Sequence, residues 1–372
     1  MNKMVISNLL HRPLRTLISM FAISIEVTLI LLIVGLCLSM LRDSADRQKG
    51  IGFDVMVQPP GSGFLTGLTG APVSIKVADK LRTLPHVTAV APIVVQILTA
   101  GNVEVVDGID LDPKSPNNFD KLGRPFHYFS GGPFQGPYDM IVDDLFATQH
   151  KAKIGDKFDL LNQSFRICGV VEHGKGARRF IPLATLQDLT GSIGKASMFY
   201  VKTDAPENAD AVVSEVKEVP GMEKYVARSL AEYASLMTAG NVPGLTGFFN
   251  IVIAIAVIIG FIVIFQSMYT AVMERTREIG ILKSLGATRL YIVSAVLRES
   301  FLLSIGGVLM GLVLTFVASI AINYAFPLHK LVWDNHWVVR ASIIAVVGAL
   351  LGGLYPALAA ARKDPIEALA YE

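Results

Sequence analysis

The stretch MERTREIGILKSLGATRLYI, Met273 to Ile292, separates two long apolar runs and decides the fold of this 372-residue chain. It is basic, because residues 273–298 carry five basic and two acidic side chains. Gly286 suits the position that ends one helix, and Thr288 suits the residue that caps the next. Short basic segments between apolar spans stay on the cytosolic side of a membrane. The stretch therefore predicts a cytosolic helix between two membrane spans.

The apolar runs predict four transmembrane helices, each long enough to cross a hydrocarbon core of roughly 30 Å. We expect them at residues 17–41, 247–272, 301–326 and 338–360. Residues 273–300 then hold the cytosolic helix and the start of the third span, and residues 327–337 form a short outer loop. The first run is too long for a signal peptide, whose apolar region has about 7 to 15 residues.

The flanking charges predict the orientation. Residues 1–16 contain Lys3, Arg12 and Arg15 but no acid, and we expect them to form an amphipathic interfacial helix. The tail, residues 361–372, also begins with basic residues. By the positive-inside rule both termini are expected in the cytosol, and residues 42–246 are expected outside it.

Residues 42–246 alternate short apolar runs with turn residues, which predicts an α+β domain of one or two lobes. Strands are expected at 55–57, 87–98, 103–106, 158–161, 165–171 and 199–201. Helices are expected at 75–84, 143–150, 183–189 and 208–219. The predicted fold class is an α-helical membrane protein of four transmembrane helices, with an α+β extracytoplasmic domain inserted between helices 1 and 2.

Composition excludes several classes of protein. The chain is 52% hydrophobic and 17% charged, which is typical of an integral membrane protein with a soluble part. Its net charge of +2 argues against nucleic-acid binding. Cys37 and Cys168 lie in a span and in the soluble part, so we expect two free thiols. The motifs H-E-x-x-H, G-x-S-x-G and G-x-x-x-x-G-K-[ST] do not occur, and we predict no catalytic residue, metal site or bound cofactor in this chain.

Glu26 lies in the middle of the first predicted span, where an ionised group costs several kcal/mol unless it is paired or faces a cavity. Two interpretations stay open. Glu26 contacts substrate, or it is a protonated carboxyl that bonds a neighbouring helix, with Gln266 and Ser267 as candidate partners.

Glycine patterns suggest two further features. Gly307 and Gly311, like Gly348 and Gly352, are spaced for close helix packing. Residues 58–72, QPPGSGFLTGLTGAP, form either a flexible connector or an apolar lip that touches lipid or substrate. The apolar side chains of such a lip would be Phe64, Leu65 and Leu68.

Two motifs resemble a known family. ERTREIGILKSLGAT (274–288) and YPALAAARKDPIEALAYE (355–372) are similar to the permease module of FtsX/MacB/LolC-type, or type VII, ABC transporters. Residues 42–246 resemble the MacB-like periplasmic core. The resemblance implies a homodimer or a pair of homologous permeases in the bacterial inner membrane, in contact with membrane lipid, with or without a periplasmic adaptor.

The resemblance also implies a coupling helix that docks on a separate ABC ATPase subunit, which would bind ATP and Mg²⁺. The residues implied in this coupling are Glu274, Arg275, Arg277, Glu278, Ile279, Leu282, Lys283 and Gly286. ATP hydrolysis would then move the outer domain and export or extract an amphipathic substrate, a mechanism called mechanotransmission. The alternative is a protein that transports nothing and uses the same motion to activate an extracytoplasmic partner such as a cell-wall hydrolase.

Overall fold

The computed structural model describes residues 13–62, 71–98, 104–242, 244–325, 331 and 333–363. The chain forms two compact units. One contains residues 1–39 and 244–372, and the other contains residues 40–243. The predictions for residues 1–12, for Phe64, Leu65 and Leu68, and for residues 364–372 lie outside the described part of the chain.

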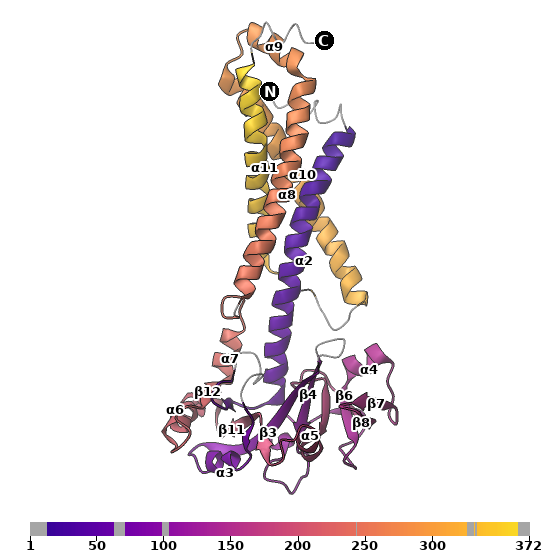
Figure 1. The fold of residues 1–372 in the computed structure, drawn as a ribbon, viewed down its shortest axis with the longest axis vertical. Helices are drawn as coiled ribbons and strands as arrows, with labels where there is room; N and C mark the ends of the chain where they lie inside the picture. Colours follow the sequence, from indigo (N-terminus) through magenta and orange to yellow (C-terminus); the bar gives the residue numbers. More distant parts are fainter. Residues whose placement is uncertain are drawn as a thin grey trace. The chain divides into compact units, whose positions relative to one another are not determined.

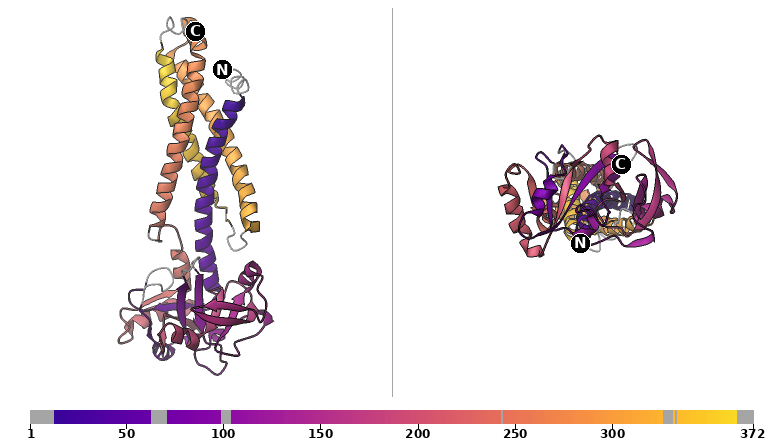
Figure 2. Two further views of the ribbon diagram at one scale, coloured as in Figure 1. Left: turned by 45° about the vertical axis from the view of Figure 1, so that its right-hand side comes forward. Right: turned by 90° about the horizontal axis from the view of Figure 1, so that it is seen from below.

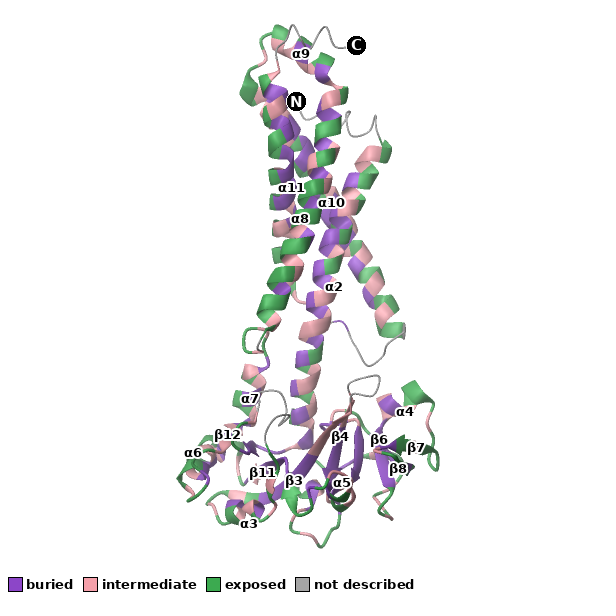
Figure 3. Cartoon of the chain, in the orientation of Figure 1, coloured by how far each residue is buried: buried purple, intermediate pink, exposed green. Residues whose placement is uncertain are grey.

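The first unit is a bundle of long apolar helices (Figures 1 and 2). They are α2 (Pro13–Ile51), α8 (Leu245–Glu274), α10 (Arg289–Ala325) and α11 (Asn335–Arg362). Each is long and apolar enough to cross a membrane, so the four predicted spans are confirmed. Figure 3 shows exposed residues along the outer faces of these helices. Many of them are large and apolar; examples are Ile255, Ile259, Leu309 and Val347. Such faces match a hydrocarbon environment.

Glycines let these helices approach closely. A Cβ atom added to Gly307 of α10 would lie 2.6 Å from Cβ of Ile23 in α2, and one on Gly311 would lie 2.9 Å from Cβ of Val27. On α11, a Cβ on Gly352 would lie 2.8 Å from the Phe261 carbonyl oxygen of α8. Gly348 is different, because its nearest neighbour would be a methyl carbon of Val257 at 3.9 Å, an ordinary contact.

The second unit contains a ten-stranded mixed sheet in the order β12-β1-β11-β3-β4-β9-β6-β8-β5, with β7 paired to β8. The strands are β1 (Val55–Gln58), β3 (Val87–Leu98), β4 (Glu104–Ile109), β5 (Tyr128–Gly131), β6 (Asp139–Asp143), β7 (Lys157–Leu160), β8 (Gln163–Val171), β9 (Arg179–Pro182), β11 (Met198–Thr203) and β12 (Val226–Ser229). A separate pair joins β2 (Val73–Ser74) to β10 (Lys195–Ala196). The helices are α3 (Val77–Arg82), α4 (Asp144–His150), α5 (Leu183–Leu189), α6 (Ala209–Glu218) and α7 (Leu230–Leu236), with 3-10 turns at Phe119–Leu122 and Pro206–Asn208.

Two hydrophobic cores lie along this one sheet, so the domain has two lobes. The first core includes Val57, Phe199 and Val212, and the second includes Val106, Phe165 and Ile181. Strand β3 joins them, because its first half pairs with β11 and its second half pairs with β4. The predicted α+β class is confirmed, and both cysteines are free thiols as predicted.

The glycine contacts give a matched pair of variants on one helix. We expect Gly352→Ala to lower the melting temperature of the purified protein in detergent, because the new methyl group would meet the backbone of α8. We expect Gly348→Ala to keep or raise it, because the methyl group has room and alanine favours a helix by about 1 kcal/mol over glycine. Equal melting temperatures for the two variants would contradict this packing.

Candidate functional site

The candidate site is built around α9 (Thr276–Ser284), the short helix that joins α8 to α10 at one end of the bundle (Figure 1). It begins after Arg275, whose φ of −109° and ψ of 17° interrupt the helix. The hydroxyl of Thr276 donates to the carbonyl oxygens of Val272 and Met273 at 3.2 and 2.9 Å, so the last turn of α8 keeps hydrogen-bond partners.

The break after α9 has the predicted chemistry. Gly286 has a φ of 95°, a left-handed conformation that glycine adopts without strain. The Thr288 hydroxyl oxygen accepts a hydrogen bond from the Tyr291 amide at 3.2 Å at the start of α10. The chain therefore ends one helix and starts the next within a few residues, and α9 has defined limits at both ends.

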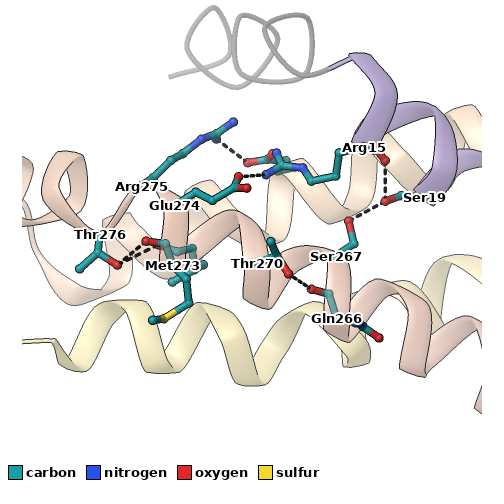
Figure 4. Close-up of polar contacts among 11 residues, drawn as sticks. Arg15, Ser19, Gln266, Ser267, Thr270, Met273, Glu274, Arg275 and Thr276 are labelled. Atoms are coloured by element: carbon teal, nitrogen blue, oxygen red, sulfur yellow. Dashed lines mark hydrogen bonds and ion pairs between the residues drawn. The ribbon is translucent and has the colours of Figure 1, made fainter. Parts of the chain in front are cut away.

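Ion pairs tie the beginning of α9 to α2 and α10 (Figure 4). Glu299 of α10 accepts from Arg15 of α2 at 3.4 Å and from Arg275 at 3.3 Å. Arg15 also reaches Glu274 at the end of α8, at 3.2 Å. The Glu299 side chain is only 7% exposed, so its charge depends on these two guanidinium groups. The four charges sum to zero.

A second contact ties the end of α9 to α11. The Lys283 ammonium group donates to the carbonyl oxygens of Ala361, at 3.0 Å, and Lys363. These carbonyls lie at the C-terminal end of α11, where helical carbonyls lack partners within the helix and the helix dipole favours a positive charge. Lys283 thus links α9 to the last of the four long helices.

The two faces of α9 differ. Ile279 and Leu282 are half-buried and line a small pocket of about 50 Å³ between α8, α9 and α10. The outward face carries Arg277 and Ile281, and Leu285 follows it with 79% of its surface exposed. Glu278 is also exposed, at the rim of the pocket that Ile279 and Leu282 line.

The structure therefore divides the residues implied in coupling into two groups. Glu274, Arg275 and Lys283 bind other parts of this chain, and Ile279 and Leu282 face inward. Arg277, Glu278 and Gly286 are exposed. Sequence reasoning missed Arg15, Glu299 and Ile281 as residues of this site. Only Glu299 carried a signal, because it is an acid at the start of an apolar run.

Glu26 lies against α8, where a Cβ on Gly260 would be 1.9 Å from its Oε2 atom. Its Oε1 atom has no hydrogen-bond partner among the described residues. No hydrogen bond joins Glu26 to the predicted partners among the described residues: Ser267 shares a 2.6 Å hydrogen bond with Ser19, and the Gln266 backbone carbonyl accepts from Thr270. Both lie six or seven residues beyond Gly260, about 9 to 10 Å along the helix axis.

Within the described ranges, no group of three or more His, Cys, Asp or Glu side chains is arranged to hold a metal.

The shared carboxylate gives a direct test of how α9 is held. We expect Glu299→Gln to destabilise the protein by about 3 kcal/mol, because it removes the buried carboxylate that Arg15 and Arg275 share. The measurements are the melting temperature in detergent and amide hydrogen exchange over residues 273–286, which should become faster. Glu278→Gln, the same change on the exposed face of α9, is the control and should alter neither. Identical behaviour of the two variants would contradict the assigned role of Glu299.

Comparisons with known proteins agree with this architecture. The MacB-like periplasmic core domain family matches residues 16–219, and the FtsX-like permease C-terminal family matches residues 250–365. A macrolide export ATP-binding/permease protein MacB from Shewanella is 25% identical over 97% of this chain and 59% of its own length. Its namesake from Campylobacter jejuni is 26% identical over 100% of this chain and 61% of its own length.

Among solved structures, the periplasmic region of MacB from Actinobacillus actinomycetemcomitans aligns with 49% of this chain and 92% of its own, at 16% identity and a TM-score of 0.37. The chain spans about 60% of the length of the two curated relatives. One family match covers more than half of the chain, and a second covers three of the four long apolar helices. The chain is therefore a multi-pass membrane protein that belongs to the FtsX/MacB-type family of ABC transporter permeases.

Proposed function

We propose that this chain is the permease subunit of an export complex in the bacterial inner membrane, and that α9 is the helix on which an ABC ATPase acts. ATP and Mg²⁺ bind to the ATPase, which is a separate subunit. ATP hydrolysis moves α9, and the long helices carry this motion to the outer domain, which exports or extracts an amphipathic substrate. The termini and α9 lie in the cytosol, and residues 42–246 lie outside it.

The observation that carries this proposal is the attachment of α9 to all four long helices. It continues directly from α8 and leads into α10. Arg275, the residue before α9, pairs with Glu299 of α10, and Arg15 of α2 pairs with the same carboxylate. At the other end, Lys283 of α9 binds carbonyl oxygens at the end of α11. A force on α9 therefore reaches every span at once. A merely basic loop would not need a buried charge pair at one end and an ammonium group bound to helix carbonyls at the other.

The outward face of α9 supplies the docking surface. Arg277 and Glu278 offer one charge of each sign, and Ile281 and Leu285 expose 44% and 79% of their surface. Exposed apolar side chains framed by charges are typical of a binding surface. The residues that bind within the chain, Arg275 and Lys283, hold this surface in place instead of contacting the ATPase.

Sequence features that support the rest of the proposal are the basic flanks of the spans and the absence of G-x-x-x-x-G-K-[ST] from this chain. The two named MacB relatives are ATP-binding/permease proteins, and this chain spans about 60% of their length. The permease acts as a homodimer or with a homologous partner.

For Glu26, we favour a protonated carboxyl packed against Gly260 over a substrate contact, because Glu26 is 6% exposed and covered by α8.

The docking surface is tested with Leu285→Asp. We expect the amount of ATPase that co-purifies with the permease, and its permease-dependent ATP hydrolysis, to fall at least about tenfold, since a carboxylate would have to be buried in the interface. The control is Ile193→Asp, the same kind of change at a residue of the soluble domain that is 72% exposed. It should leave both measurements unchanged. Normal assembly and normal coupled hydrolysis in the Leu285→Asp complex would refute α9 as the docking helix.

A further inference from the structure

The C-terminal end of α2 is held firmly inside the soluble unit. A Cβ added to Gly50 would lie 1.7 Å from the Gly174 carbonyl oxygen, so the two backbones are in direct contact. The Gly176 amide donates to the Arg47 carbonyl at 3.0 Å, and the Tyr200 hydroxyl donates to Gln48 at 2.9 Å. We call this arrangement, residues 43–51 of α2 with residues 174–177, the α2 socket.

A row of alternating charges crosses the α2 socket. Asp143, at the end of β6, binds Arg178 at 3.2 Å, and Arg178 binds Asp43 of α2 at 3.6 Å. Asp43 binds Arg47 one turn along α2 at 3.4 Å. Asp107 of β4 lies against the α2 socket, where a Cβ added to Gly176 would be 3.5 Å from its Oδ2 atom, and the charge of Arg47 lowers its pKa. The row therefore connects α2 with β4 and β6, two strands of the second lobe that β9 separates.

The row contains three carboxylates and two guanidinium groups, so its net charge is −1 when all five groups are ionised. Asp107 is the carboxylate least able to keep that charge. It is 4% exposed, and its Oδ1 atom has no hydrogen-bond partner in the part of the chain that the structure describes. Burial raises the pKa of Asp107 to about 7, although Arg47 and a hydrogen bond from the Ala177 amide act in the opposite direction.

The other titratable groups around the row are already engaged. Tyr200 of β11 donates to Gln48, and Tyr233 of α7 bonds to Ser44. Lys175, next to Gly176, donates to the Arg124 carbonyl oxygen at 3.1 Å. At the far end of the row, His173 binds Asp144 at 3.0 Å. The excess charge of the row is therefore relieved most simply by a proton on Asp107.

We propose that proton uptake by Asp107 controls how tightly the soluble domain holds the end of α2. With Asp107 protonated, the row is neutral and the α2 socket stays closed. With Asp107 ionised, a buried carboxylate is only partly compensated by Arg47, and the α2 socket opens more often. This regulation goes beyond the proposed transport function and does not depend on which ATPase or substrate the complex uses.

The direction of the pH effect follows from linkage. Between the ordinary pKa of an aspartate, 3.8, and the raised value of about 7, the closed socket binds more protons than the open one. Closure is therefore most favourable at low pH, weakens as the pH rises through this window, and becomes independent of pH above it. Between pH 6 and pH 8, the frequency of opening should rise about tenfold.

Amide hydrogen exchange of the full-length protein in lipid nanodiscs tests this proposal. Exchange of residues 43–51 and 174–178, corrected for the intrinsic effect of pH, should be about tenfold faster at pH 8 than at pH 6. Asp107→Asn should remove this difference and keep the slow exchange at both pH values. Asp159→Asn, the same change at an exposed aspartate of β7, should behave like the unmodified protein.

A second variant keeps the proposal testable if Asp107→Asn does not fold. Arg47→Met removes the cation that lowers the pKa of Asp107, so the window of rising exchange should extend to higher pH. A purely structural role of Arg47 would instead speed exchange by the same factor at every pH. The proposal is overturned by exchange at the α2 socket that does not depend on pH in the unmodified protein, or by an Asp107→Asn protein that keeps the full pH dependence.

Discussion

The buried carboxylate of Glu299 is the constraint on which the rest of the site depends. A charge that is 7% exposed must be compensated, and its two cations come from Arg15 of α2 and from Arg275 at the start of α9. This single requirement fixes α9 against two helices that are far apart in the sequence. Together with Lys283 at the other end, it attaches a short basic segment to the long helices on both sides.

Helix α2 is held by charged contacts in the other unit as well. It is one continuous helix of 39 residues, with Arg15 near its start and the α2 socket at its end. An unbroken helix of this length spans roughly 60 Å and needs no loop to carry a displacement. On the proposed function, the soluble domain would handle the exported substrate or activated partner, and the ATPase would act at α9. Charged contacts hold both ends of α2, and at the α2 socket burial raises the pKa of Asp107 to about 7.

Local sequence signals were sufficient for much of the fold. The spans were predictable because each apolar run satisfies the length requirement by itself, and β3 and α5 have the predicted limits. Strands β6 and β9 were missed because charged residues stand at their ends and resemble loop residues. Their charges are satisfied by distant partners: Asp139 binds Arg166, Asp143 binds Arg178, and Arg179 binds Glu104. The helix break at Gly286 could also be predicted, because a glycine in this position is a local signal. The Arg15–Glu299 pair joins residues 284 positions apart, so no local pattern reveals it.

The central claim is that motion of α9 reaches the soluble domain through the ion pairs at the start of α2. The most direct measurement is amide hydrogen exchange of residues 43–51 in the assembled complex, with and without a non-hydrolysable ATP analogue, compared between the unmodified protein and Arg15→Gln. The account predicts that the nucleotide changes this exchange in the unmodified complex. The change should disappear in Arg15→Gln while the ATPase remains bound. An equally large nucleotide effect in both complexes would contradict it.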